Sequence, residues 1–393
     1  MKKEYAPLVV FLFMTATTPR FLSLSIAITI ATTLCGCTTP ARPESASSES
    51  SATSVSSDSS VSSDSSKQAV ETLATGLVVP WDIAFLPSGD LLVTERGGTV
   101  KRIGKDHKTY VIDGVRQSGE GGLLGIALHP AFGENGFVYL YLTGESMGVI
   151  ENRVERYRFV DDTLTDRTVI LSDIPAAARH DGGALSFGPD GYLYVTTGDA
   201  TEDGLAQDLN SLAGKILRIA DDGSIPADNP FRNAVYSYGH RNPQGITWDD
   251  EGILWSTEHG RSIPLSGYDE LNRITKGGNY GWPVIQGSEQ RDGMVTPIKH
   301  SGANDTWAPA SAAYWNGSVY FGGLRGGALY EAGITLQIFP FYEHLAGDYG
   351  RIRAVRAGPD GFLYITTSNR DGRGSMRPGD DKLLRIDPTQ FKR

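Results

Sequence analysis

Six short loops of this chain combine glycine with residues that can transfer protons or bind anions. They span residues 119–125, 179–183, 239–245, 257–261, 323–327 and 350–353. His180 is a candidate general base, because imidazole titrates close to physiological pH. Arg241 could polarise a carbonyl group and stabilise negative charge that develops on its oxygen. Taken alone, however, a turn histidine bonded to the backbone and an arginine in a surface ion pair are the more common interpretations.

The elements that position these loops follow a repeated pattern. A tight turn opens an apolar, strand-like segment at six places: 87–93, 134–140, 189–195, 250–255, 315–320 and 359–365. A second short strand follows each copy and often ends in Arg-Ile. Turn glycines next to such strands indicate hairpins, and recurrence at intervals of about 45 to 65 residues indicates repeated sheet units. We therefore predict an all-β six-bladed β-propeller, with an ordinary β-sandwich as the alternative.

Length, charge and composition limit the remaining possibilities. The repeats run from residue 71 to 388 of a 393-residue chain, so we predict one large domain, residues 69–393, that closes on itself. The 47 glycines suit a turn-rich protein. The formal net charge of −10 argues against nucleic acid as a partner, because a surface that follows phosphates is basic.

The first 68 residues are predicted to be targeting and linker segments. Arg20 precedes the apolar stretch 21–33, which is short for a spanning helix, and residues 34–37, Leu-Cys-Gly-Cys, resemble a bacterial lipobox. Residues 1–36 would then be a signal peptide and Cys37 a lipid-modified anchor on an exported, outward-facing protein. A secreted product and an uncleaved anchor are the alternatives.

Two features of this segment bear on the domain. Residues 45–66 contain 14 serines, so we predict that 37–68 is a disordered, flexible linker. The two cysteines of the chain both lie at positions 35 and 37, which leaves the predicted domain without disulfide or thiolate–metal chemistry.

Taken together and in order, the polar loops resemble those of the soluble glucose and aldose sugar dehydrogenases that depend on pyrroloquinoline quinone (PQQ), the glucose/sorbosone dehydrogenase family. The most specific segments are 239–245, Gly-His-Arg-Asn-Pro-Gln-Gly, and 277–283, Gly-Gly-Asn-Tyr-Gly-Trp-Pro. The resemblance implies a PQQ- and calcium-dependent enzyme that oxidises aldose sugars at the anomeric carbon to lactones. Hydride would pass to the quinone, and the electrons then to an unidentified acceptor.

The same resemblance implies roles for individual residues. His180 matches the catalytic histidine, and Arg241 matches a catalytic arginine beside a quinone oxygen. The three carboxylates of PQQ call for a pocket rich in cations and donors. The cofactor-binding residues would be Glu120, Arg241, Asn242, Arg325, Arg351 and Arg353. Glu120 stands where the glucose enzymes have Gln, so a neutral contact is replaced by an acid.

Calcium would occupy two places. One Ca²⁺ would be held against the quinone by backbone carbonyls of Gly260 and Arg261, since a hard cation prefers oxygen ligands. A second, structural Ca²⁺ would use the Glu270 carboxylate and the Tyr280 carbonyl. A solvent-facing acid at a strand start is the alternative for Glu270.

Three departures from the family pattern qualify these roles. Arg261 stands where Pro is common, and residues around 262–266 are inserted after it. Arg179 stands where the glucose enzymes have Asp, so we expect His180 to lack a carboxylate partner or to be oriented by another group. We also expect Trp307 to form a wall against the planar cofactor.

Two other functions remain open. A calcium-dependent propeller lactonase would need no organic cofactor, but lactones carry no charge that calls for so many arginines. A non-catalytic, lipid-anchored propeller could instead bind carbohydrate or peptide. The sequence leaves open which aldose is the substrate, whether PQQ is bound in vivo, and whether the protein is a monomer or a dimer.

Overall fold

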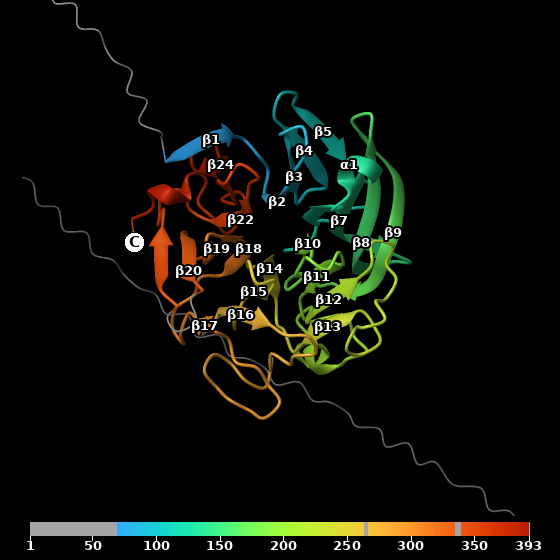
Figure 1. Ribbon diagram of the computed structural model, residues 1–393, viewed down its shortest axis with the longest axis vertical. Coiled ribbons are helices and arrows are strands. Elements are labelled where there is room, and N and C mark those ends of the chain that lie inside the picture. The colour runs from blue at the N-terminus through green and yellow to red at the C-terminus, as the bar shows by residue number, and fades with distance from the viewer. Residues whose placement is uncertain (1–68, 263–265, 335–338, 393) are drawn as a thin grey trace, which may run out of the picture. The chain divides into compact units, whose positions relative to one another are not determined.

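The computed structural model describes residues 69–262, 266–334 and 339–392. Within these ranges, 24 strands form six four-stranded antiparallel sheets around a common axis (Figure 1). The prediction of an all-β, six-bladed propeller is therefore confirmed. The expected signal peptide at 1–36, the lipidation site Cys37 and the linker 37–68 lie outside the described residues. No helix in the described ranges is long and apolar enough to cross a membrane.

Five blades are continuous in sequence, and their strands run from the centre of the molecule outward. Blade 1 contains β2 (Pro80–Phe85), β3 (Leu91–Glu95), β4 (Thr99–Ile103) and β5 (Lys108–Val111). Blade 2 contains β6 (Leu123–Leu128), β7 (Phe137–Ser146), β8 (Val149–Val160) and β9 (Thr163–Pro175). Blade 3 contains β10 (Leu185–Phe187), β11 (Leu193–Thr197), β12 (Lys215–Ile219) and β13 (Val235–Tyr238).

Blades 4 and 5 follow the same plan, with short helical turns elsewhere in the chain. Blade 4 contains β14 (Pro243–Trp248), β15 (Leu254–Glu258), β16 (Glu270–Ile274) and β17 (Lys299–His300). Blade 5 contains β18 (Pro309–Trp315), β19 (Ser318–Gly323), β20 (Leu329–Gly333) and β21 (Phe341–His344). The helical turns are α1 (Phe132–Asn135), η1 (Asp203–Gln207) and η2 (Pro388–Gln390).

The sixth blade joins the two ends of the domain. It contains β22 (Ile352–Ala357), β23 (Leu363–Thr367) and β24 (Leu383–Ile386), and β1 (Val70–Ala74) adds its outer strand beside β24 (Figure 1). The innermost strands β2, β6, β10, β14, β18 and β22 each contact the next around the ring. The domain therefore closes on itself, as the repeats predicted.

The repeated phrase has two structural causes. The six predicted turn glycines, Gly89, Gly136, Gly191, Gly252, Gly317 and Gly361, all have positive φ between 66° and 89°, a conformation that other residues rarely adopt. In three blades the turn aspartate also pairs with the arginine of the third strand: Asp90–Arg102 at 2.5 Å, Asp190–Arg218 at 2.9 Å and Asp360–Arg385 at 2.7 Å. These arginines thus hold the blade together.

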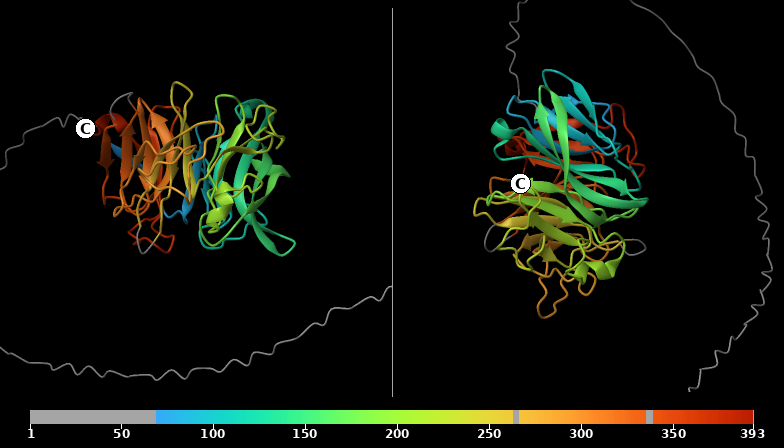
Figure 2. Two further views of the ribbon diagram at one scale, coloured as in Figure 1. Left: turned by 90° about the horizontal axis from the view of Figure 1, so that it is seen from below. Right: turned by 90° about the vertical axis from the view of Figure 1, so that its right-hand side faces the viewer.

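Strand alternation gathers the polar loops at one end of the propeller. The segment before each innermost strand and the loop between the second and third strands lie at the same end, because neighbouring strands are antiparallel. Glu120, His180 and Arg351 occupy the first kind of position, and Gly260 and Arg325 the second. The long β7–β8 hairpin projects beyond the neighbouring blades at this end (Figure 2).

Candidate active site

A cavity of about 430 Å³ lies where the polar loops meet. The residues that line it are Glu120, Arg179, His180, Arg241, His259, Gly260, Arg261, Ser262, Ser266, Asp269, Thr306, Ala308, Leu324, Arg325, Arg351 and Arg373. Seven of the residues proposed from the sequence are among them. The structure therefore brings most of the predicted site residues together, although in sequence they extend from the start of blade 2 to the start of blade 6.

His180 has a carboxylate partner, although Arg179 stands at the position where the sequence resemblance implies an acid. His180 Nδ1 lies 2.7 Å from Asp199 Oδ1, and both side chains are buried. Because an ionised carboxylate only accepts hydrogen bonds, this contact places a proton on Nδ1 and leaves Nε2 as the ring nitrogen that can receive another. The first alternative, loss of a carboxylate partner, is therefore wrong, and the second, orientation by another group, is met by Asp199 in the loop after β11.

Asp199 is itself held by two further donors. The Thr201 N–H donates to Asp199 Oδ1 at 2.8 Å, and Trp282 Nε1–H donates to Oδ2 at 2.9 Å. In the sequence, only the neighbouring Gly198 hints at the position of Asp199. Glycine is needed there because an added Cβ would lie 1.9 Å from the His180 carbonyl oxygen. His180 also has φ of +66°, so the loop carrying the candidate base is held in an unfavourable conformation by its neighbours.

Glu120 links the base loop to a second loop at the cavity. One carboxylate oxygen accepts the His180 N–H at 3.0 Å, and the other accepts Arg373 Nη1–H at 2.7 Å. Burial alone would raise the pKa of Glu120, but these hydrogen bonds hold it at about 2. Glu120 is therefore charged, and Arg373, which the sequence reasoning missed, compensates that charge.

Arg351 and Arg353 have different environments. Arg351 lines the cavity and donates to Asp371 Oδ2 at 3.0 and 2.6 Å. Arg353 is buried outside the lining, where Nη1 donates to Gln244 Oε1 at 2.6 Å and the guanidinium stacks over Trp81. Burial, and then the neighbouring Arg351, lower the pKa of Arg353 to about 9.

Two buried donors lie within two residues of the cavity lining in sequence and have no partner of their own on any residue that the structure describes. Arg353 Nε and Asn242 Nδ2 have no hydrogen-bond partner among the described residues. Asn242 Oδ1 is occupied, since it accepts the Gly182 N–H at 3.0 Å. Unpaired buried donors are unfavourable unless a ligand satisfies them, so this end of the propeller fits a polar, acceptor-rich guest.

The inserted segment binds two of the predicted arginines. Arg241 Nη2 donates to Ser262 Oγ at 2.7 Å, and Arg325 Nη1 donates to Ser266 Oγ at 2.8 Å. Burial lowers the pKa of Arg241, whose guanidinium also lies 5.3 Å from the Trp282 ring centre. Ser262 and Ser266 thus help to position these two cations.

Asp269 fixes the loop expected to bind calcium at the cavity. Its Oδ1 accepts the Gly260 N–H at 2.8 Å, while Oδ2 accepts Thr306 Oγ1–H and the Trp307 N–H. The Arg261 side chain takes no part in these contacts, and its Nη2 donates to the Ala303 carbonyl at 2.9 Å.

Trp307 does not form the expected cofactor wall. Its ring is buried, 4% exposed, and packs against Phe321, Tyr330 and Phe341 inside blade 5. Only its neighbours Thr306 and Ala308 reach the cavity lining.

Glu270 and Tyr280 border a second, much smaller cavity. Its volume is about 10 Å³, close to the space of one water molecule or bare ion, and Glu258 and Gln286 also line it. Burial, and then the charge of Glu258, raise the pKa of Glu270 to about 8. Gln286 Oε1 has no hydrogen-bond partner in the described part of the chain. Two close acids and a free amide oxygen suit a hard cation.

These calcium positions depend on backbone oxygens and single acids. No group of three or more His, Cys, Asp or Glu side chains in the described ranges is arranged to hold a metal ion. The roles of Gly260, Arg261, Glu270 and Tyr280 as ligands therefore stay predictions.

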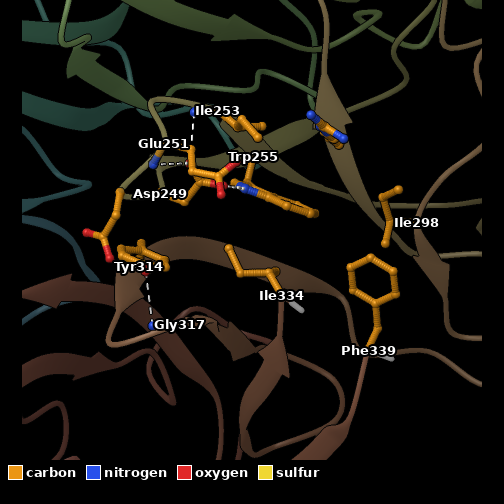
Figure 3. Close-up of a pocket in the computed structure, with 11 residues that line it drawn as sticks. Asp249, Glu251, Ile253, Trp255, Ile298, Tyr314, Gly317, Ile334 and Phe339 are labelled. Atoms are coloured by element: carbon orange, nitrogen blue, oxygen red, sulfur yellow. Dashed lines mark hydrogen bonds between the residues drawn. The ribbon is translucent and has the colours of Figure 1, made fainter. Parts of the chain in front are cut away.

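A separate hollow of about 270 Å³ lies between blades 4 and 5 (Figure 3). There Trp255 Nε1–H donates to Asp249 Oδ2 at 2.9 Å, and Tyr314 and Ile334 lie on the facing side. None of the site residues proposed from the sequence borders it, so the chemistry is assigned to the cavity around His180.

Comparisons with known proteins show which proteins this chain resembles. The family model described as Glucose / Sorbosone dehydrogenase matches residues 77–377. An aldose sugar dehydrogenase of Escherichia coli is 32% identical, over 81% of this chain and 92% of that protein. Quinoprotein glucose dehydrogenase B of Acinetobacter calcoaceticus is 30% identical, over 60% of this chain and 56% of that protein. The solved PQQ-bound form of an aldose sugar dehydrogenase from Streptomyces coelicolor is 40% identical with a TM-score of 0.75, covering 81% of this chain and 97% of that one.

Proposed function

Because this chain belongs to the glucose/sorbosone dehydrogenase family, we propose that it oxidises an aldose at the anomeric carbon to the lactone, with PQQ and calcium. The observation that carries the proposal is the buried His180–Asp199 pair on the wall of an arginine-rich cavity. PQQ, when bound, supplies the acceptor for the hydride.

His180 takes the proton in the proposed reaction. The C1–H bond of the sugar breaks and its electron pair leaves as hydride, while the C1 hydroxyl proton passes to His180 Nε2 and a C1=O bond forms. Asp199, held by Trp282 and Thr201, keeps the proton on Nδ1 and offsets the positive charge that the ring gains. His180 is therefore the general base and Asp199 its positioning residue.

The donors around the cavity fit a guest that carries three carboxylates. Arg325 and Arg351 line the cavity, and Arg353 lies buried beside Arg351 with an unpaired Nε. Asn242 adds an unpaired amide donor, and Arg241 would polarise a carbonyl oxygen of the cofactor. Glu120 is charged, so it would face the cofactor as one partner of its ion pair with Arg373 and not as a neutral hydrogen-bonding group.

Calcium is proposed at two places. Gly260 and Arg261 line the main cavity, where an ion held by their carbonyls would add positive charge next to the cofactor. Glu270 and Tyr280 border the small cavity, where an ion would neutralise the two neighbouring acids.

The lactonase alternative has less support. Such an enzyme would hold its ion with acidic and amide side chains in the channel, whereas six arginines line this cavity against two acids. We also propose, from the sequence alone, that the protein is exported and anchored through lipidated Cys37. Mass spectrometry of the mature N-terminus tests this, and an unmodified cysteine would contradict it.

Reconstitution tests the proposed activity. The purified protein is treated with a chelator and then supplied with calcium and PQQ, and dye reduction is followed with a panel of aldoses. We expect turnover that needs both additions and is lost in His180→Ala. Absence of turnover together with no PQQ-dependent rise in Tm would reject the proposal.

A further inference from the structure

The cavity carries more positive charge than the proposed cofactor uses. Its lining contains Arg179, Arg241, Arg261, Arg325, Arg351 and Arg373, against the acids Glu120 and Asp269. The whole chain has a formal net charge of −10, so this is a local reversal of sign. The three carboxylates of PQQ account for Arg325, Arg351 and the buried Arg353. Arg241 is assigned to a carbonyl of the cofactor, and Arg261 donates to the Ala303 carbonyl. Arg179 and Arg373 remain unassigned.

Arg179 is the least compensated of these cations. Its side chain is exposed at the cavity and forms no hydrogen bond or ion pair with any described residue. Neither lining acid is free to neutralise it. Asp269 accepts hydrogen bonds from Gly260, Thr306 and Trp307, and both oxygens of Glu120 are also occupied.

Arg373 lies on the same side of the cavity as the candidate base. Glu120 accepts from both the His180 N–H and Arg373 Nη1, so one carboxylate ties the two together. The Arg373 side chain is still 53% exposed, which leaves donors free for a ligand. Arg179 directly precedes His180 in the chain, so both cations stand at the edge of the place where C1 would react.

We propose that the substrate is an acidic aldose, a sugar that carries a carboxylate or a phosphate, with its anionic group held by Arg179 and Arg373. This inference rests on the proposed function. A guanidinium binds either group through charge-assisted hydrogen bonds, and the two groups differ mainly in charge and size. The free anomeric carbon then meets His180, and the reaction itself is unchanged.

Kinetics with matched sugars test the proposal. D-glucose is compared with D-glucuronate and glucose 6-phosphate, and D-galactose with D-galacturonate. We expect kcat/KM for the preferred acidic sugar to be about tenfold higher than for its neutral partner, mainly through KM. This preference should shrink as salt concentration rises, because the two cations are partly exposed. The carboxylate and phosphate arms identify which acidic group is used.

Variants separate a binding role from a structural one. Arg179→Gln should remove most of the tenfold preference, and Arg179→Lys should restore part of it, because a positive charge returns without the planar fork. Arg158→Gln is the matched control, because Arg158 is exposed on β8 at the opposite end of blade 2. The control should keep the full preference.

A binding measurement is independent of turnover. Calorimetry compares methyl glucuronide with methyl glucoside, neither of which has a free anomeric hydroxyl to oxidise. We expect the glucuronide to bind about tenfold more tightly than the glucoside to the wild type, and most of this difference to be lost in Arg179→Gln. Turnover of neutral sugars with no acidic preference in either assay would overturn this inference and leave the proposed function intact. A glucuronide preference with no turnover of any sugar would support the anion site and reject the dehydrogenase.

Discussion

Replacing Asp199 with Asn should disable the candidate base while keeping the shape of the site. In the wild type, Oδ1 accepts from His180 Nδ1 and the Thr201 N–H, and Oδ2 accepts from Trp282 Nε1–H. An amide has only one accepting oxygen. In one orientation the amide NH₂ faces the Trp282 Nε1–H, so that two donors meet. In the other orientation the NH₂ faces the Thr201 N–H and donates to His180 Nδ1, which forces the His180 proton onto Nε2.

The size of the effect follows from this geometry. The His180–Asp199 contact is 2.7 Å long, Asp199 is 0% exposed and His180 is 8% exposed. A buried hydrogen bond to a charged group contributes about 2–3 kcal/mol, towards the upper part of the usual range. If that contribution is made only when the imidazole becomes charged, kcat should fall about 30- to 150-fold.

The assay is steady-state turnover of the reconstituted protein, with Tm measured on the same samples. We expect kcat for Asp199→Asn to fall with KM changed less than threefold. Combining it with Trp282→Phe removes the donor that opposes the amide, so the double variant should recover part of the lost rate. A kcat within threefold of wild type in the folded Asp199→Asn protein would refute the role of Asp199.

Three further predictions concern the surroundings of the site. Glu270→Gln should at least halve the rise in Tm that calcium produces, since ligand binding stabilises only through its site; an unchanged rise would exclude Glu270 as a ligand. Burial raises the pKa of Asp181 to about 7 from 3.8 in the unfolded chain, so the free energy of unfolding should fall as pH rises between these values. Urea titrations at pH 5 and pH 8 measure this decrease, which should be smaller in Asp181→Asn than in the wild type by at least about 1 kcal/mol. An equal decrease in the two proteins would contradict the assignment. Gly198→Ala should cost about 1–3 kcal/mol and lower kcat, because its Cβ would lie 1.9 Å from the His180 carbonyl; thermal melting that matches wild type would be inconsistent with that contact.

The fold was predictable because its signals are local and repeated. A glycine with positive φ is needed at each of the six hairpin turns, so the sequence must show it there. Asp90, Asp190 and Asp360 each pair with an arginine on the third strand of their blade, so this local contact also leaves a repeated pattern in the sequence. The role of Trp307 was not predictable, because an aromatic residue beside a polar loop packs equally well into a blade or against a ligand.

Asp199 shows which part of a propeller site can be found from sequence. Residues before an innermost strand and residues just after a second strand reach the same end of the molecule, because antiparallel strands alternate in direction. Asp199 follows β11 and Asp371 follows β23, while His180 and Arg351 precede β10 and β22. The topology therefore predicts that, within one blade, an acid after the second strand can meet a base or cation that precedes the innermost strand. Which pairs come within hydrogen-bond distance depends on loop conformation, such as the close approach of Gly198 to the His180 carbonyl, and this is set by contacts that a single sequence does not display.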